Sequence, residues 1–293
     1  MKKFLIGCGI VAALGIACIV VGTWAIAQWA KSKFPDTKRI EAMQKDLEER
    51  FGERDKFVPA STLDPTRVEM FLTIRDSLVG RGTVVADDIE NLSRIGKQMD
   101  KKNRGLIERI VQGRNAARSG IGIATRAMEY TAQRDTALLA AGMGHGEYGY
   151  LFALSYFSYL EWIPAVGDTA TADQVVHSNT GGAQTLWAMR ETFIRQLRNL
   201  ETKLVAAPAR DRAAEELLTL IRSEIAATTG GGRFPLAGHV PADWRTVLDR
   251  YRERITATRP KSPDELFLDR MQFRDEEFNF QIERDTKSQS PGG

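Results

Sequence analysis

The chain has 293 residues, of which 43% are hydrophobic and 27% are charged, and this balance excludes an intrinsically disordered protein. The formal net charge is +3, from 41 Lys and Arg against 38 Asp and Glu. A protein that binds nucleic acid by neutralising phosphates needs a basic excess, so we expect no nucleic-acid partner. At about 150 residues per domain, the length allows one or two domains with a buried core.

The amino terminus carries an uncharged run from Phe4 to Ala30, preceded by Lys2 and Lys3. A helix rises ~1.5 Å per residue, so about 20 apolar residues span a bilayer core of ~30 Å. We therefore predict that residues 1–33 form a signal anchor, with residues 4–30 as a single transmembrane helix in the inner (cytoplasmic) membrane. The short basic head resembles a bacterial signal sequence and favours a periplasmic soluble domain, whereas the Lys and Arg residues after the span favour the opposite orientation.

Two alternatives to an uncleaved anchor stay open. Ala25-Ile26-Ala27 has the spacing of a signal-peptidase site, although the apolar run before it is longer than the ~7–15 residues of an ordinary signal peptide. Cys8 and Cys18 each end a segment similar to a bacterial lipobox, which would mean lipidation. The rest of the chain contains no cysteine, which excludes disulfides and cysteine-based metal sites there.

Residues 34–285 predict one all-helical (all-α) soluble domain of about eight irregularly packed helices, because apolar residues recur at helical spacing and β-branched alternating runs are absent. Three residue patterns predict helix starts: Asp64-Pro65, Asp211 and the capping box that begins at Ser262. Gly80 is expected to end the helix that begins at Pro65, and a separate helix is expected from Thr83 to Met99. Residues 286–293 are predicted to be a disordered tail. The remaining helices are expected from Ile40 to Phe51, from Arg104 to Leu138, from Leu186 to Leu204 and from Pro241 to Ile255. The helix from Arg104 contains a glycine-rich segment, which either breaks the helix or allows a neighbouring helix to pack closely against it.

An aromatic-rich stretch lies between Gly144 and Pro164, with seven aromatic residues in the fifteen positions from Tyr148 to Trp162. We predict that it forms the central core helix of the domain, with tyrosine hydroxyls that reach the surface. Two alternatives remain: the aromatic side chains line a ligand pocket, or the stretch is a second membrane span. Glu161 and the hydroxyl-bearing side chains argue against the membrane span.

The segment Gly144–Gly149 matches the Gly-x-Gly-x-x-Gly dinucleotide fingerprint, but no strand precedes it. We therefore interpret it as a turn between helices and expect no cofactor. The three histidines, His145, His177 and His239, have no partner at metal-ligand spacing, so no metal site is predicted. A Gly-x-Ser-x-Gly nucleophile motif is also absent from the sequence, and we predict no catalytic residues.

The ends of the aromatic stretch supply the candidate ligand-binding residues: His145, Glu147, Tyr148, Glu161 and Trp162. Glu147 and Glu161 lie about 21 Å apart along a helix, too far to act as a carboxylate pair on one bond, and each is expected to pair with an arginine. We predict a membrane-anchored, extracytoplasmic helical module that binds or scaffolds a protein partner in the bacterial envelope. The alternative is a hydrolase or lipid-binding enzyme whose site is assembled from distant residues around the aromatic helix.

Overall fold

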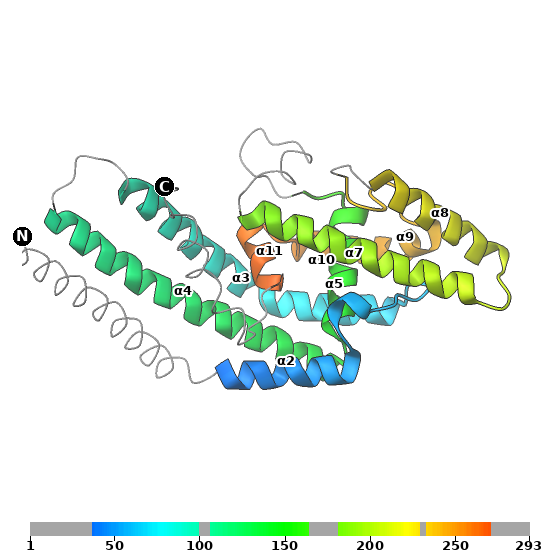
Figure 1. Cartoon of the computed structure of the whole chain (residues 1–293), viewed down its shortest axis with the longest axis horizontal. Coiled ribbons are helices and arrows are strands. Elements are labelled where there is room, and N and C mark those ends of the chain that lie inside the picture. The colour runs from blue at the N-terminus through cyan, green and yellow to red at the C-terminus, as the bar shows by residue number, and fades with distance from the viewer. Residues whose placement is uncertain (1–36, 100–105, 164–180, 229–232, 271–293) are drawn as a thin grey trace, which may run out of the picture. The chain divides into compact units, whose positions relative to one another are not determined.

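Figure 1 shows the whole chain as a computed structural model, which describes residues 37–99, 106–163, 181–228 and 233–270. The predicted anchor at residues 1–33 and the predicted tail at residues 286–293 lie outside these ranges. Within them, no helix combines the length and the apolarity that a membrane span needs. The chain divides into two compact units after Arg39, and the fold described below is that of the unit from Ile40 onward.

Every regular element in the described ranges is helical, which confirms the all-helical prediction for these residues. They contain nine α-helices, where about eight were predicted. The two helices expected between Pro65 and Met99 form one, and the segment expected to form one helix from Pro241 to Ile255 forms two. In chain order the elements are α2 (Thr37–Phe51), the 3-10 helix η1 (Arg54–Lys56), α3 (Pro65–Met99), α4 (Leu106–Ala141), α5 (His145–Phe152), the π-helix η2 (Ala153–Tyr159), α7 (Gly181–Ala206), α8 (Arg212–Thr228), α9 (Ala242–Asp249), α10 (Arg252–Ala257) and α11 (Pro263–Arg270).

The predicted helix starts at Asp64, Asp211 and Ser262 are all confirmed. The carboxylates of Asp64 and Asp211 each accept a backbone N–H from the first turn of α3 and α8, at 2.8 Å in both cases. Ser262 Oγ accepts the N–H of Glu265 at 3.3 Å, as in a capping box. These side chains satisfy backbone donors that have no partner inside the helix.

The prediction that Gly80 ends a helix was wrong, because α3 continues through it to Met99. A glycine inside a helix costs up to ~1 kcal/mol relative to alanine, which packing against a long neighbouring helix can outweigh. α3 lies side by side with α4, which is also unbroken through its glycine-rich segment (Figure 1). A Cβ atom at Gly82 would lie 3.4 Å from the ring of Tyr130, in ordinary van der Waals contact, so α4 packs closely against α3 at this position.

The aromatic stretch forms α5 and η2, and it is the core helix that the sequence predicts. α5 contacts both α3 and α7, and in Figure 1 it crosses between them. Phe152 is fully buried, and its ring centroid lies 4.7 Å from that of Tyr156 in an edge-to-face arrangement. The predicted exposure of the tyrosine hydroxyls was wrong for Tyr148, Tyr150 and Tyr156, which are all buried, whereas the hydroxyl of Tyr159 reaches the exposed Asp249. The buried hydroxyls therefore need partners inside the protein.

Candidate functional site

A buried ion pair lies beside the aromatic helix. Arg75 of α3 donates two hydrogen bonds through Nη1 to Asp269 of α11, at 2.8 Å to Oδ1 and 2.7 Å to Oδ2. Both side chains are only 2% exposed. The guanidinium also lies over the rings of Phe152 and Tyr156, with Cζ 5.0 and 5.6 Å from the ring centroids. This pair joins α3 to α11, the last described helix, within the core.

Three tyrosine hydroxyls complete the hydrogen bonding of this ion pair. Tyr130 and Tyr148 donate to Asp269 Oδ1 at 2.6 and 2.8 Å. Tyr156 accepts a hydrogen bond from Arg75 Nε at 3.3 Å and donates to the carbonyl oxygen of Thr258 at 3.1 Å. Burial raises the pKa of all three tyrosines above the ordinary value, and the charge of Asp269 raises it further. The hydroxyls therefore remain protonated donors at neutral pH. We interpret the cluster as a polar core that orients helices and not as an acid–base site.

A second buried pair holds the carboxyl end of α11. Arg134 of α4 donates through Nε to Asp135 Oδ1 at 2.9 Å, and through Nη1 to the carbonyl oxygens of Leu268 and Asp269 at 3.0 and 2.9 Å. Gln44 of α2 donates to Asp135 Oδ2 at 3.1 Å. The last carbonyls of a helix lack partners within it and carry its negative dipole end, so a guanidinium satisfies both their hydrogen bonding and their charge.

The sequence-predicted candidate His145 belongs to this second cluster. Its side chain is 3% exposed, its Nε2 lies 3.5 Å from Asp135 Oδ1, and neither ring nitrogen has a hydrogen-bond partner within the described residues. Burial and the nearby guanidinium groups of Arg134 and Arg54 hold the pKa of His145 well below 6.5. The imidazole is therefore neutral at neutral pH and is enclosed by protein instead of facing a ligand.

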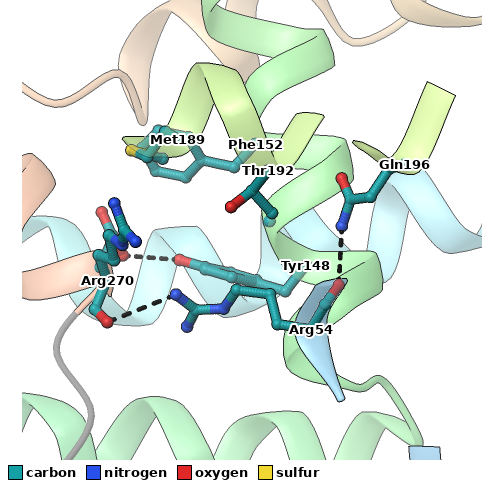
Figure 2. A pocket seen from close by; sticks show the side chains of 9 residues that line it. Arg54, Tyr148, Phe152, Met189, Thr192, Gln196 and Arg270 are labelled. Carbon is teal, nitrogen blue, oxygen red and sulfur yellow. Dashed lines mark hydrogen bonds between the residues drawn. The ribbon is translucent and has the colours of Figure 1, made fainter. Parts of the chain in front are cut away.

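A small cavity lies between these clusters (Figure 2). It has a volume of about 30 Å³, which holds one or two water molecules, whereas ligand pockets usually span ~300–1,000 Å³. Figure 2 shows Arg54 of η1, Tyr148 of α5 and Gln196 of α7 around it. Tyr148 is the one sequence-predicted candidate that lines the cavity. The cavity is too small for the substrate of a hydrolase or a lipid-binding enzyme, so it gives that alternative no support.

The other three candidates lie apart from the cavity. Glu147 pairs with Arg67 of α3 in a two-point contact, with Nε 2.6 Å from Oε1 and Nη2 2.5 Å from Oε2, which confirms the predicted arginine partner. Glu161 is exposed, has a positive φ of 51°, and makes no ion pair with any other residue in the described ranges. Trp162 stacks on Phe157, with ring centroids 5.9 Å apart and an interplanar angle of 10°. The five candidates therefore do not form one site.

A groove of about 720 Å³ lies where α7 ends and α8 begins, and the start of α9 closes one of its sides. This volume falls within the usual range of ligand sites. Leu220 and Ala214 of α8 are half-buried, so their apolar surface is open to a ligand. The floor comes from Leu200, Leu204, Ala214, Leu217 and Leu220, and the rim carries the charged residues Lys203, Asp211, Glu216 and Asp243.

The residues that organise the interior are ones that sequence reasoning did not select. Arg75 shares a helical face with Val68, Phe71, Leu72 and Leu78, all of which are fully buried. A charged residue on an apolar helix face predicts a buried ion pair, because burying an isolated charge has a large free-energy cost. That signal was present for Arg75, but the identity of its partner was not.

No protein-family model, no curated protein and no solved structure matches this sequence.

Proposed function

We propose that this chain is a membrane-tethered helical module that binds a segment of a protein partner in the groove between α7 and α8. The observation that carries the proposal is the groove itself, with its volume of about 720 Å³ and its apolar floor. The tether is proposed from the uncharged run at residues 4–30 and its basic head. The same head favours a periplasmic location for the soluble domain.

The lining of the groove favours a protein segment over a small polar molecule. An apolar floor with a charged rim is the usual anatomy of a protein–protein interface. The floor residues Leu217 and Leu220 lie on one face of α8, and Leu200 and Leu204 lie on one face of α7, since residues three and four apart share a helix face. Leu200, Leu204 and Leu217 are buried, so the half-buried Ala214 and Leu220 present the apolar surface that would receive the apolar face of an amphipathic helix.

Membrane attachment and its side are tested on the native membrane. Full-length protein should stay in the pellet after alkaline carbonate extraction, because a spanning helix is held by the bilayer core. Protease added to spheroplasts should digest the domain. Release of the protein by carbonate would contradict the anchor, and digestion only after lysis would place the domain in the cytoplasm.

The groove is tested by photo-crosslinking in living cells. In one variant, a benzophenone amino acid replaces Lys203 at the rim of the groove. In the control variant, it replaces Lys45 on α2, whose side chain is 77% exposed. We expect a crosslinked protein from position 203 alone. Leu220→Glu should remove that product, while Thr219→Glu, which adds the same charge at the neighbouring exposed position, should retain it. Equal products from both positions, or none from either, would contradict a partner in the groove.

A further inference from the structure

Arg54 lines the small cavity and is half-buried. Its Nη1 donates to the carbonyl oxygen of Arg270 at 3.4 Å, and its Nε is buried with no hydrogen-bond partner. Among the described residues, no carboxylate lies within 4.0 Å of it. Burial and the like charges of Arg134 and Arg270 lower the pKa of Arg54 to about 10, so it still carries a positive charge at neutral pH.

The neighbouring carboxylates compensate Arg54 only in part. Arg75 is paired with Asp269, and Arg134 is paired with Asp135, so both nearby buried carboxylates already have a guanidinium partner. Asp135 and Asp55 attract Arg54 without forming an ion pair with it, and its half-buried guanidinium keeps a buried Nε that has no hydrogen-bond partner. Buried charges are normally paired, because removing a lone charge from water costs several kcal/mol or more.

The cavity offers the space and the second polar group that a bound ion would use. Gln196 is fully buried, and its Nε2 donates to the carbonyl oxygens of Gly146 and Arg54, at 2.9 and 3.2 Å. These bonds fix the orientation of the amide, and they leave Oε1 buried without a donor. In Figure 2, the Gln196 amide points toward the backbone of Arg54, and the Arg54 side chain extends from there toward Arg270. The cavity, which Asp269 also lines, has room for one or two water-sized groups.

We infer that this cavity binds one small monovalent inorganic anion of the size of chloride, which accepts a hydrogen bond from Arg54 Nε. A water molecule fills the remaining space, donating one hydrogen to the anion and the other to Gln196 Oε1. The anion neutralises the unpaired guanidinium, and the water satisfies the unpaired amide oxygen. The site is separate from the groove between α7 and α8 and does not depend on what binds there.

The test uses full-length protein in a non-ionic detergent, with sodium chloride exchanged for sodium gluconate at constant ionic strength, because gluconate is too large for the cavity. An anion that binds only the folded protein stabilises it, so chloride should raise Tm saturably, by roughly 2–4 °C. Arg54→Gln removes the unpaired charge, so this variant should lose the chloride response and melt in gluconate no lower than the parent. The matched control, Arg195→Gln, removes a surface arginine that pairs with Asp55 and should keep the response.

A second measurement locates the ion directly. Crystals grown in sodium bromide should show an anomalous peak beside Arg54 Nε, and this readout holds even if Arg54→Gln fails to fold. A map with no bromide peak in the cavity would overturn the inference. An equal chloride response in the parent and in Arg54→Gln would overturn it as well, because the ion would then act elsewhere.

Discussion

Replacing Asp269 by asparagine removes the counter-ion of Arg75 while keeping the shape of the side chain. The amide group would then direct N–H groups toward the Arg75 Nη1 that now lies 2.7 Å from Oδ2, so a donor would face a donor. Because both side chains are 2% exposed, bulk solvent cannot replace the lost acceptor, and the small cavity that Asp269 lines has room for only one or two water molecules. Breaking a buried pair from one side costs ~3–5 kcal/mol, and the donor conflict places this case near the upper end of that range. This loss is a large share of a stability of ~5–15 kcal/mol.

The assay is urea unfolding of the full-length protein in detergent, followed by circular dichroism at 222 nm, with the free energy taken by linear extrapolation. The matched control is Asp249→Asn. Asp249 is also a carboxylate that accepts a tyrosine hydroxyl, from Tyr159 at 2.5 Å, but it is exposed. Surface substitutions of this kind usually change stability by no more than ~0.5 kcal/mol.

A loss for Asp269→Asn no larger than that of the control would refute the reasoning, because it would mean that Arg75 is solvated or paired elsewhere. A double-mutant cycle with Arg75→Met adds a second check. If the two residues form the pair, the double variant should lose less stability than the sum of the single variants, since neither then leaves a charge buried alone. Additive losses would show that the two side chains do not interact.

Two further predictions concern the turn into α5. Because the pKa of His145 is lowered in the folded protein, the unfolded chain binds a proton at this residue at a higher pH than the folded protein does. The free energy of unfolding should therefore fall as the pH drops below about 6.5, by up to ~1.4 kcal/mol per pH unit. His145→Gln should lose this part of the pH dependence in unfolding measured from pH 7 to 5; an unchanged slope would show that another group causes it. Gly146→Ala should destabilise by ~1–3 kcal/mol, because its Cβ would lie 2.5 Å from Phe57 Cβ. Gly149→Ala meets nothing within 4 Å and should stabilise by ~0.5–1 kcal/mol, so equal effects of the two changes would contradict this packing.

Local signals in the sequence determined the helical class, the helix starts and the identity of the core helix. A cap acts within three or four residues, as Asp64 and Asp211 do, so its effect does not depend on distant parts of the chain. The aromatic density between Tyr148 and Trp162 predicts burial for a similar reason, since so much apolar surface must leave water wherever the helix packs. The prediction that Gly144–Gly149 forms a turn between helices was wrong for most of the segment, because Gly144 is the N-cap and the chain is helical from His145 onward.

Only the tertiary structure decided which polar residues share the interior. Arg75 and Asp269 are 194 positions apart, and no local pattern connects them. The continuity of α3 through Gly80 was also decided by packing, because α4 lies alongside that segment and outweighs a small loss of helix propensity. The unpaired charge of Arg54 appears only when the carboxylates around it are seen to be engaged by other arginines. Electrostatic pairing depends on distances of a few ångströms between side chains, and the packing of helices far apart in the chain sets those distances.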